Sequence, residues 1–492
     1  MVPRRRRPPP SVFIFPRFLH SSNTRFPHPR AKFPNHHRSS SPHPNPRTAP
    51  PRDSVSPFAA EMPPRRLSAK RRRCRATEAA AAEADALISL PPGVLDDILT
   101  RVGIRDAVRT SALSRAWRRR WEALSSLDLI FPSLGYDKVP PEALGAVDCI
   151  LLRFPGSVRR FCANLDNAYA GRIHDWLRVL SRRGIEILDL KFGYGFALPP
   201  SVFSCSRLTS LTLSSCVIPL LPLGFVAFPE LRRLTLVYVQ LQEYGGYQLE
   251  EIIETSPLLE YLSLISVLIR GDYVRKWVIR APNLRHLEAC SDYDDDGWIL
   301  KKLTSLRCAK IAFTVFLVHR NFAKFLSGLV QVTELSVSTG YIPSSAKMPE
   351  ILCTFHNLKS LNLKVHFYKQ HPIMLTLYLL KSAPNLEELK LKIYDEEELE
   401  FEANGEFLNA LWADGMCANL QVVQMSGIHW LPNEMSFIEL ILSKARRLHT
   451  LSISHSEEIV MSNEDALNEL LRYRRASTEA QILFKGKTED YY

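Results

Sequence analysis

Residues 208–216 read LTSLTLSSC, in which Leu208, Leu211 and Leu213 form the pattern L-x-x-L-x-L and Cys216 follows three residues later. Successive side chains of a β-strand point to opposite faces, so Leu211 and Leu213 share one face and Thr212 points to the other. Further copies begin at Leu231, Leu259, Leu284, Val332, Leu358, Leu386, Leu420 and Leu448, with earlier copies at Ile185 and Val158 and a weaker one at Leu303. From residue 185 onward, most starts are separated by 23 to 34 residues. This spacing predicts short units that stack to bury a shared core.

Each unit reads as a helix, a stop and a strand. Apolar runs at residues 249–253 and 374–380 have helical spacing and precede the next leucine pattern. A proline ends a helix and favours an extended chain, and prolines stand just ahead of several strands, at Pro229, Pro257, Pro282 and Pro384. The sequence therefore predicts an α/β fold in which helices alternate with strands.

The pattern resembles that of leucine-rich repeats, whose ninth position accepts Asn or Cys. Cys216 occupies that position here. The resemblance implies a solenoid, in which a curved parallel sheet carries helices on its convex side. The residue between the two strand leucines then faces the concave surface, where a target protein would bind. Five such positions are the candidate target-binding residues: Thr212, Thr235, Ser263, Asn362 and Lys390.

The last stretch, residues 407–492, has a pattern of its own. It contains Trp412, the segment CANLQVVQMSGI and a closing R-A-S-x-x-A-x-hydrophobic motif that begins at Arg475. These residues resemble the FBD region that ends many plant F-box and leucine-rich-repeat proteins. The resemblance implies a final repeat and a cap, in which the last helix and strand cover the end of the solenoid, and it indicates no binding role.

Ahead of the repeats, residues 86–129 read ALISLPPGVLDDILTRVGIRDAVRTSALSRAWRRRWEALSSLDL. Pro91 and Pro92 can open a first helix, because the first helical N–H groups have no intrahelical partner. Its apolar residues fall at offsets that define a single helical face: Val94, Leu95, Ile98, Leu99 and Val102. Gly103 stops the helix. Asp106 is placed to cap a second helix and Ser114 a third, which carries Trp117, Trp121 and Leu124. Three short helices make a small core that usually needs a partner.

This module resembles an F-box, in the plant form that reads LP…IL, then DAVRTS, then LS..WR..W. The matching residues are Leu90-Pro91, Ile98-Leu99, 106–111, Leu113-Ser114, Trp117-Arg118 and Trp121. It departs from the pattern in Pro92-Gly93, where an acidic pair is more usual, and in the basic run from Arg118 to Arg120. The resemblance implies docking on a Skp-type adaptor through nine residues: Leu90, Pro91, Val94, Leu95, Ile98, Leu99, Val108, Leu113 and Trp117.

The positive charge of the chain is concentrated at its start. Residues 1–75 hold 18 Lys and Arg against 2 Asp and Glu, so the remainder holds 45 basic against 49 acidic side chains. A nearly neutral remainder argues against a specific nucleic-acid-binding face on the folded part. Residues 1–80 are rich in Pro, Arg, Ser and His and lack any period, which predicts disorder.

Several interpretations of residues 1–80 remain open. Lys70, Arg71, Arg72, Arg73 and Arg75 form a cluster that is either a nuclear localisation signal or a solvated charge run. The Arg-rich, acid-poor start loosely resembles an organellar transit peptide, but it has no clear amphipathic helix. Met62 also opens a plausible shorter protein, in which residues 1–61 would be an upstream extension.

No pattern of catalytic or metal-binding residues is present. The sequence has no phosphate loop, no G-x-S-x-G elbow and no H-E-x-x-H motif, and its nine cysteines never form C-x-x-C. The run from Asp292 to Gly297 begins like a calcium loop, but Leu303 stands at position twelve, where a glutamate is required. We therefore expect reduced thiols, no metal, no cofactor and no catalysis, although a small-molecule co-ligand stays open.

These observations give four predicted regions: a disordered tail at 1–80, an F-box at 85–129, leucine-rich repeats at 130–406 and an FBD-like end at 407–492. The F-box resemblance implies a non-catalytic substrate-recognition subunit of an SCF-type cullin–RING ubiquitin ligase, which binds an unknown target. The alternative is an interaction scaffold that does not support ubiquitination. The sequence has no run of 18 apolar residues, so it predicts no membrane-spanning helix. The expected location is the nucleus, the cytoplasm or both.

Overall fold

The computed structural model describes residues 90–102, 106, 109–112, 117, 120–123, 126–130, 141–165, 170–270, 277–291, 298–301, 303–315, 322–341, 353–367, 370–394, 406–413, 415–456 and 461–485. The chain divides into two compact units, Met1–Lys70 and Arg71–Tyr492. The first unit lies outside the described residues, as do the basic cluster at 70–75, the loop at 292–297 and the adaptor candidates Val108 and Leu113. All the described residues belong to the second unit.

One long parallel sheet organises this unit. Its main strands follow the order β1-β2-β3-β4-β5-β7-β10-β12-β13-β14-β15-β16-β17-β18, so each pairs with the next main strand in the chain. Their bounds are β1 Ser126–Ile130, β2 Ser157–Leu165, β3 Ile187–Ala197, β4 Ser210–Ile218, β5 Arg233–Val237, β7 Tyr261–Ile265, β10 His286–Ser291, β12 Cys308–Val315, β13 Glu334–Tyr341, β14 Ser360–Val365, β15 Glu388–Ile393, β16 Val422–Ile428, β17 Thr450–His455 and β18 Gln481–Lys485. Short strands β6 (Gln240–Leu241) and β8 (Leu268–Ile269) extend this sheet, and β9 (Trp277–Arg280) pairs with β11 (Trp298–Lys301) in a second one.

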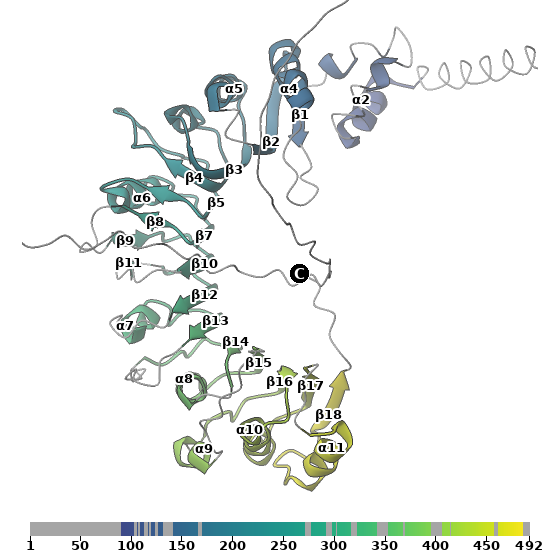
Figure 1. Ribbon diagram of the computed structural model, residues 1–492, viewed down its shortest axis with the longest axis vertical. Helices are drawn as coiled ribbons and strands as arrows, with labels where there is room; N and C mark the ends of the chain where they lie inside the picture. Colours follow the sequence, from purple (N-terminus) through teal and green to yellow (C-terminus); the bar gives the residue numbers. More distant parts are fainter. Residues whose placement is uncertain are drawn as a thin grey trace, which may run out of the picture. The chain divides into compact units, whose positions relative to one another are not determined.

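Helix α2 precedes β1, and the other helices connect the strands and lie on one side of the main sheet (Figure 1). They are α2 Pro92–Arg101, α4 Pro141–Arg153, α5 Ala170–Arg182, α6 Gly245–Glu254, α7 Phe322–Ser327, α8 Gln370–Lys381, α9 Glu406–Leu411, α10 Pro432–Lys444 and α11 Asn463–Arg472. In α5, Ile173, Trp176, Leu177 and Leu180 are buried at offsets of zero, three, four and seven, which is one helical face. The predicted combination of a parallel leucine sheet with helices on one side is confirmed.

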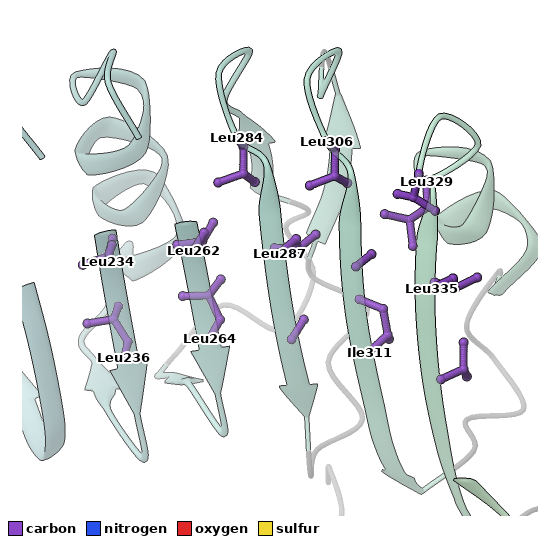
Figure 2. Packing of buried hydrophobic residues seen from close by; sticks show 14 of the residues in the cluster. Leu234, Leu236, Leu262, Leu264, Leu284, Leu287, Leu306, Ile311, Leu329 and Leu335 are labelled. Carbon is purple, nitrogen blue, oxygen red and sulfur yellow. The ribbon is translucent and has the colours of Figure 1, made fainter. Parts of the chain in front are cut away.

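The strand leucines form the core in register. Leu211, Leu234, Leu262 and Leu287 pair in turn across β4, β5, β7 and β10, and all four are buried. Figure 2 shows Leu234, Leu262 and Leu287 side by side on neighbouring strands. Burying one such side chain contributes about 1.5–3 kcal/mol, so the repeated pair of inward residues stabilises each unit.

The C-terminal part continues the same sheet. Helix α10 is tightly embedded, and its buried Glu434 accepts hydrogen bonds from the backbone N–H groups of His429 (3.0 Å) and Leu431 (2.9 Å), which fixes the start of the helix. Helix α11 is capped by Ser462, whose Oγ accepts from the N–H of Asp465 at 3.1 Å. Strand β18 then pairs with β17, so a helix and a strand occupy the end of the sheet.

Candidate protein-binding sites

Helix α2 carries two rows of apolar side chains, a buried inner lane and an exposed outer lane. Leu95 and Leu99 are each 1% exposed, whereas Val94, Ile98 and Val102 are 45%, 39% and 37% exposed. Residues four apart lie one above the other on a helix, so the three exposed side chains form a continuous stripe. The sequence predicted one apolar face, but the structure divides these residues between an inner and an outer lane.

The inner lane belongs to the buried core of the same chain. Trp117 and Trp121 are buried in the same core cluster as Leu95 and Leu99, and the Trp121 ring stacks on Phe154 at 6.4 Å between centroids. Because Phe154 directly follows α4, the helical module is joined to the first part of the repeat region. Leu95, Leu99 and Trp117 therefore hold the module together and are not exposed to a partner.

The remaining predicted adaptor residues differ in exposure. Pro91 is exposed and Leu90 is partly buried, while Val108 and Leu113 lie outside the described residues. Helix α2 begins at Pro92, with Pro91 as its N-cap, and ends at Arg101, with an extended C-cap residue, Val102. The third predicted helix takes the form of a 3-10 turn at Arg120–Ala123 in the described residues.

The face of the sheet opposite the helices, here called the open face, carries a register row of mainly polar side chains. The row runs from β3 to β17 through the residue that lies between the two inward core residues of each main strand. It contains Asp189, Thr212, Thr235, Ser263, Glu288, Lys310, Ser336, Asn362, Lys390, Gln424 and Ser452. All five predicted target-binding residues belong to it. Thr212, Thr235, Asn362 and Lys390 are partly exposed, as a binding role requires.

The structure corrects the prediction that Ser263 binds a target, because this residue is only 1% exposed. Its hydroxyl donates to Glu288 Oε2 at 3.0 Å, and the Tyr261 hydroxyl donates to the same oxygen at 3.0 Å. The small Ser263 side chain therefore lies beneath a contact between its larger neighbours. The accessible groups at this place are Tyr261, Glu288 and Lys310, not Ser263.

A charged network surrounds Glu288. Lys310 Nζ donates to Glu288 Oε1 at 2.7 Å, and the Arg233 guanidinium lies 4.0 Å from the centroid of the Tyr261 ring. Burial acts to raise the pKa of Glu288, but the hydrogen bond and charge of Lys310, with the Ser263 and Tyr261 hydroxyls, lower it overall. Glu288 and Lys310 are not among the predicted binding residues, because Ala289 and Ala309 stand where the repeat pattern has leucine and so weaken it. Only the register of the strands places Glu288 and Lys310 in the row.

A similar arrangement occurs further along the open face. Glu388 accepts from Ser360 Oγ at 2.7 Å and pairs with Lys390 Nζ at 2.8 Å. Burial acts to raise the pKa of Glu388, but these two partners lower it. The predicted binding residue Lys390 is therefore held in place by an ion pair on its own strand.

No group of three or more His, Cys, Asp or Glu side chains suited to a metal ion occurs among the described residues. In the same part of the chain, no helix is both long and apolar enough to cross a membrane. The eight described cysteines are free thiols. Burial raises the pKa of Cys205, Cys216 and Cys417 to about 12, so these thiols stay protonated near neutral pH.

Two family matches cover the parts described above. The F-box domain family matches residues 87–128, and the family described as "FBD-associated F-box protein At5g56370, LRR repeats" matches residues 173–391. Together with the helical module and the leucine sheet, these matches define a leucine-rich-repeat protein that carries an F-box.

Similar proteins place the chain more narrowly. The F-box/FBD/LRR-repeat protein At1g13570 of Arabidopsis thaliana is 30% identical over 427 residues, which span 81% of this chain and 98% of the relative. F-box/LRR-repeat protein 13 of the same plant is 25% identical over 450 residues, spanning 82% and 96%. The chain belongs to the F-box/FBD/LRR-repeat protein family. Among solved structures, a Leptospira interrogans LRR protein is 14% identical, with 74% of this chain and 91% of that chain covered and a TM-score of 0.31.

Proposed function

We propose that the chain is the target-binding subunit of an SCF-type cullin–RING ubiquitin ligase. Its F-box would dock on a Skp-type adaptor, and its repeat sheet would hold a target protein for ubiquitination. The observation that carries the proposal is the division of α2 into a buried lane, with Leu95 and Leu99, and an exposed lane, with Val94 and Ile98. A helix that is already packed on one side and apolar on the other is suited to a hydrophobic groove on a partner.

The adaptor contact would be centred on the exposed lane of α2. Val94, Ile98 and Val102 follow one another at four-residue intervals, the spacing at which helical side chains enter a groove. The inner lane contributes indirectly, since Leu99 packs in the core that fixes the orientation of the helix. Exposed Pro91, at the start of the same helix, extends this surface.

The role of the chain in ubiquitin transfer would be proximity. A target held on the repeats lies near a ubiquitin-loaded E2 enzyme for long periods, which raises its effective concentration at the reacting group. Ubiquitin would pass from the E2 to the target without bonding to this chain. The open face, with its row of polar side chains from Asp189 to Ser452, is the proposed surface for the target.

The test is co-purification of the full chain with a Skp-type adaptor. The variant Val94→Asp with Ile98→Asp places two charges in the exposed lane and should lose the adaptor. Its matched control is Leu467→Asp with Leu471→Asp, since these leucines are also exposed and four apart, but on α11. Wild type and the α11 variant should retain the adaptor.

Failure of the wild-type chain to bind, or equal binding by the α2 variant, would overturn the adaptor contact. Thermal unfolding of each variant shows whether the fold is preserved. Depletion of this chain in cells then separates the ligase from the scaffold: accumulation of an endogenous target supports the ligase, and an unchanged set of protein levels contradicts it.

The basic cluster at residues 70–75 is proposed as a nuclear import signal, which would give the chain access to nuclear targets. Replacing its five basic residues, Lys70, Arg71, Arg72, Arg73 and Arg75, with glutamine should shift a fluorescent fusion from the nucleus to the cytoplasm. An unchanged distribution would contradict this proposal.

A further inference from the structure

The residue just before each strand from β3 to β17 belongs to one column along the edge where the strands begin. Backbone hydrogen bonds join its members: the N–H of Arg285 donates to the carbonyl of Glu260 at 2.8 Å, and the N–H of Arg307 donates to that of Arg285 at 2.9 Å. This strand-start column contains Glu186, Thr209, Arg232, Glu260, Arg285, Arg307, Thr333, Lys359, Glu387, Gln421 and His449. Its side chains are neighbours across adjacent repeats.

Charges in the strand-start column mostly meet the opposite sign. Arg232 pairs with Glu260 at 2.7 Å, and Lys359 pairs with Glu387 at 2.5 Å. Elsewhere the neutral residues Thr209, Thr333 and Gln421 separate the charged ones. Arg285 and Arg307 are the exception, because they are adjacent members with the same charge.

Both arginines are exposed, and nothing in the described part of the chain neutralises them. Neither guanidinium has a hydrogen-bond or ion-pair partner among the described residues. Of the acidic residues on the neighbouring strands, Glu260 holds Arg232 and Glu288 holds Lys310. Like charges side by side on neighbouring strands destabilise a sheet, so the fold itself gains nothing from this pair.

We propose that Arg285 and Arg307 form a recognition site for an acidic segment of a partner polypeptide, binding its Asp or Glu carboxylates. The strand-start column provides the precedent, because Arg232 and Lys359 each bind a carboxylate of the same column. Guanidinium groups offer paired N–H donors that match a carboxylate. The partner thus supplies the negative charge that the column lacks at this position. The inference concerns the repeats alone and does not depend on α2 binding an adaptor.

The test measures binding of a fluorescein-labelled hexaglutamate peptide to the full chain at physiological ionic strength. The variant Arg285→Gln with Arg307→Gln should weaken binding about tenfold or more, because hydrogen bonds to charged groups are among the stronger ones. The matched control is Arg178→Gln with Arg182→Gln, which removes the same charge from exposed positions on α5. Since the basic residues 1–75 are present in every protein, they contribute equally, and the control should bind as wild type.

A second variant separates recognition from folding. Arg307→Glu restores alternating charge beside Arg285, so it should abolish peptide binding and leave the thermal unfolding midpoint unchanged or higher. The proposal is overturned if the Arg285/Arg307 variant binds as wild type, if the α5 control weakens binding equally, or if Arg307→Glu lowers the midpoint markedly. Tighter binding of a phosphoserine peptide of equal charge, lost in the same variant, would overturn the assignment of carboxylate as the ligand.

Discussion

Ile98 and Leu99 are consecutive residues of α2 with opposite surroundings: the Ile98 side chain is 39% exposed and that of Leu99 is 1% exposed. One step along a helix turns the side chain by about 100°, which here separates the core of the module from its outer surface. The two residues are therefore expected to affect different properties when they are shortened.

Leu99→Ala should lower the free energy of unfolding by about 2–5 kcal/mol, because it leaves a cavity in the core to which Leu95, Trp117 and Trp121 also belong. Ile98→Ala should change it by about 0.5 kcal/mol or less, as is usual for surface positions. The adaptor complex should show the reverse order, since Ile98 lies in the exposed lane. Urea unfolding of the two variants makes the comparison, and equal losses of stability would contradict the two-lane arrangement.

Glu288→Gln should destabilise the protein at neutral pH by about 1 kcal/mol, because it removes a charged acceptor shared by Lys310, Tyr261 and Ser263. The pKa of Glu288 is lowered on folding, so its ionised form stabilises the fold above its unfolded pKa of about 4.5. That contribution is lost as the pH falls through the lower, folded pKa. Unfolding curves for wild type and variant should differ at pH 7 and converge in acid. A constant difference at every pH would show that the ionised carboxylate is not responsible.

The buried thiol of Cys216 should make stability fall in alkali. Burial raises its pKa from 9.0 to about 12, so the unfolded chain loses the thiol proton first as the pH rises. Stability from this group is complete below pH 9 and is lost between about pH 9 and 12. When the pH is raised from 8 to 10, the free energy of unfolding of Cys216→Ala should therefore fall less than that of wild type.

Thiol labelling gives an independent measure of the same burial. Cys149 is exposed, whereas Cys205, Cys216 and Cys417 are buried. In the folded protein at pH 8, Cys149 should react with a thiol reagent and the three buried thiols should react only after denaturation. Rapid labelling of Cys216 in the native protein would contradict its position in the core.

Gly427 lies at a close approach between two strands. Its φ is +73°, and a Cβ placed there would lie 2.6 Å from the carbonyl oxygen of Ile393. Gly427→Ala should therefore destabilise the protein by more than about 1 kcal/mol, the usual cost of the backbone conformation alone. Gly415 is the control, because its φ is +82° but no atom lies within 4 Å of its added Cβ. Equal melting temperatures for the two alanine variants would rule out the steric contact.

The leucine sheet could be predicted because its signal is local. In L-x-L, the alternation of a strand alone puts Leu211 and Leu213 on one face and Thr212 on the other, and the structure places all three accordingly. Strands β6 and β8 have two residues each, which is too short to show a period. Their presence depends on pairing after β4, and no single stretch of sequence records that pairing.

The candidate sites could be predicted only in part. The sequence brought the apolar residues of α2 together, but their separation into lanes depends on where Trp117 and Trp121 pack. Likewise, Ser263 occupies a middle strand position, as predicted, and is nevertheless covered because Glu288 and Tyr261 meet above it. Both differences arise from residues that are distant in the chain and become neighbours only through packing or strand register.

Each main strand of the sheet pairs with the next main strand in the chain, and this has a consequence during synthesis. A new repeat needs only its predecessor as a template, so the growing polypeptide can extend its sheet one strand at a time as it leaves the ribosome. The helical module and β1 emerge before the later strands and give them a surface to dock on. A ribosome stalled after any complete unit would thus already display a folded F-box, with the most recent strand as its exposed growing edge.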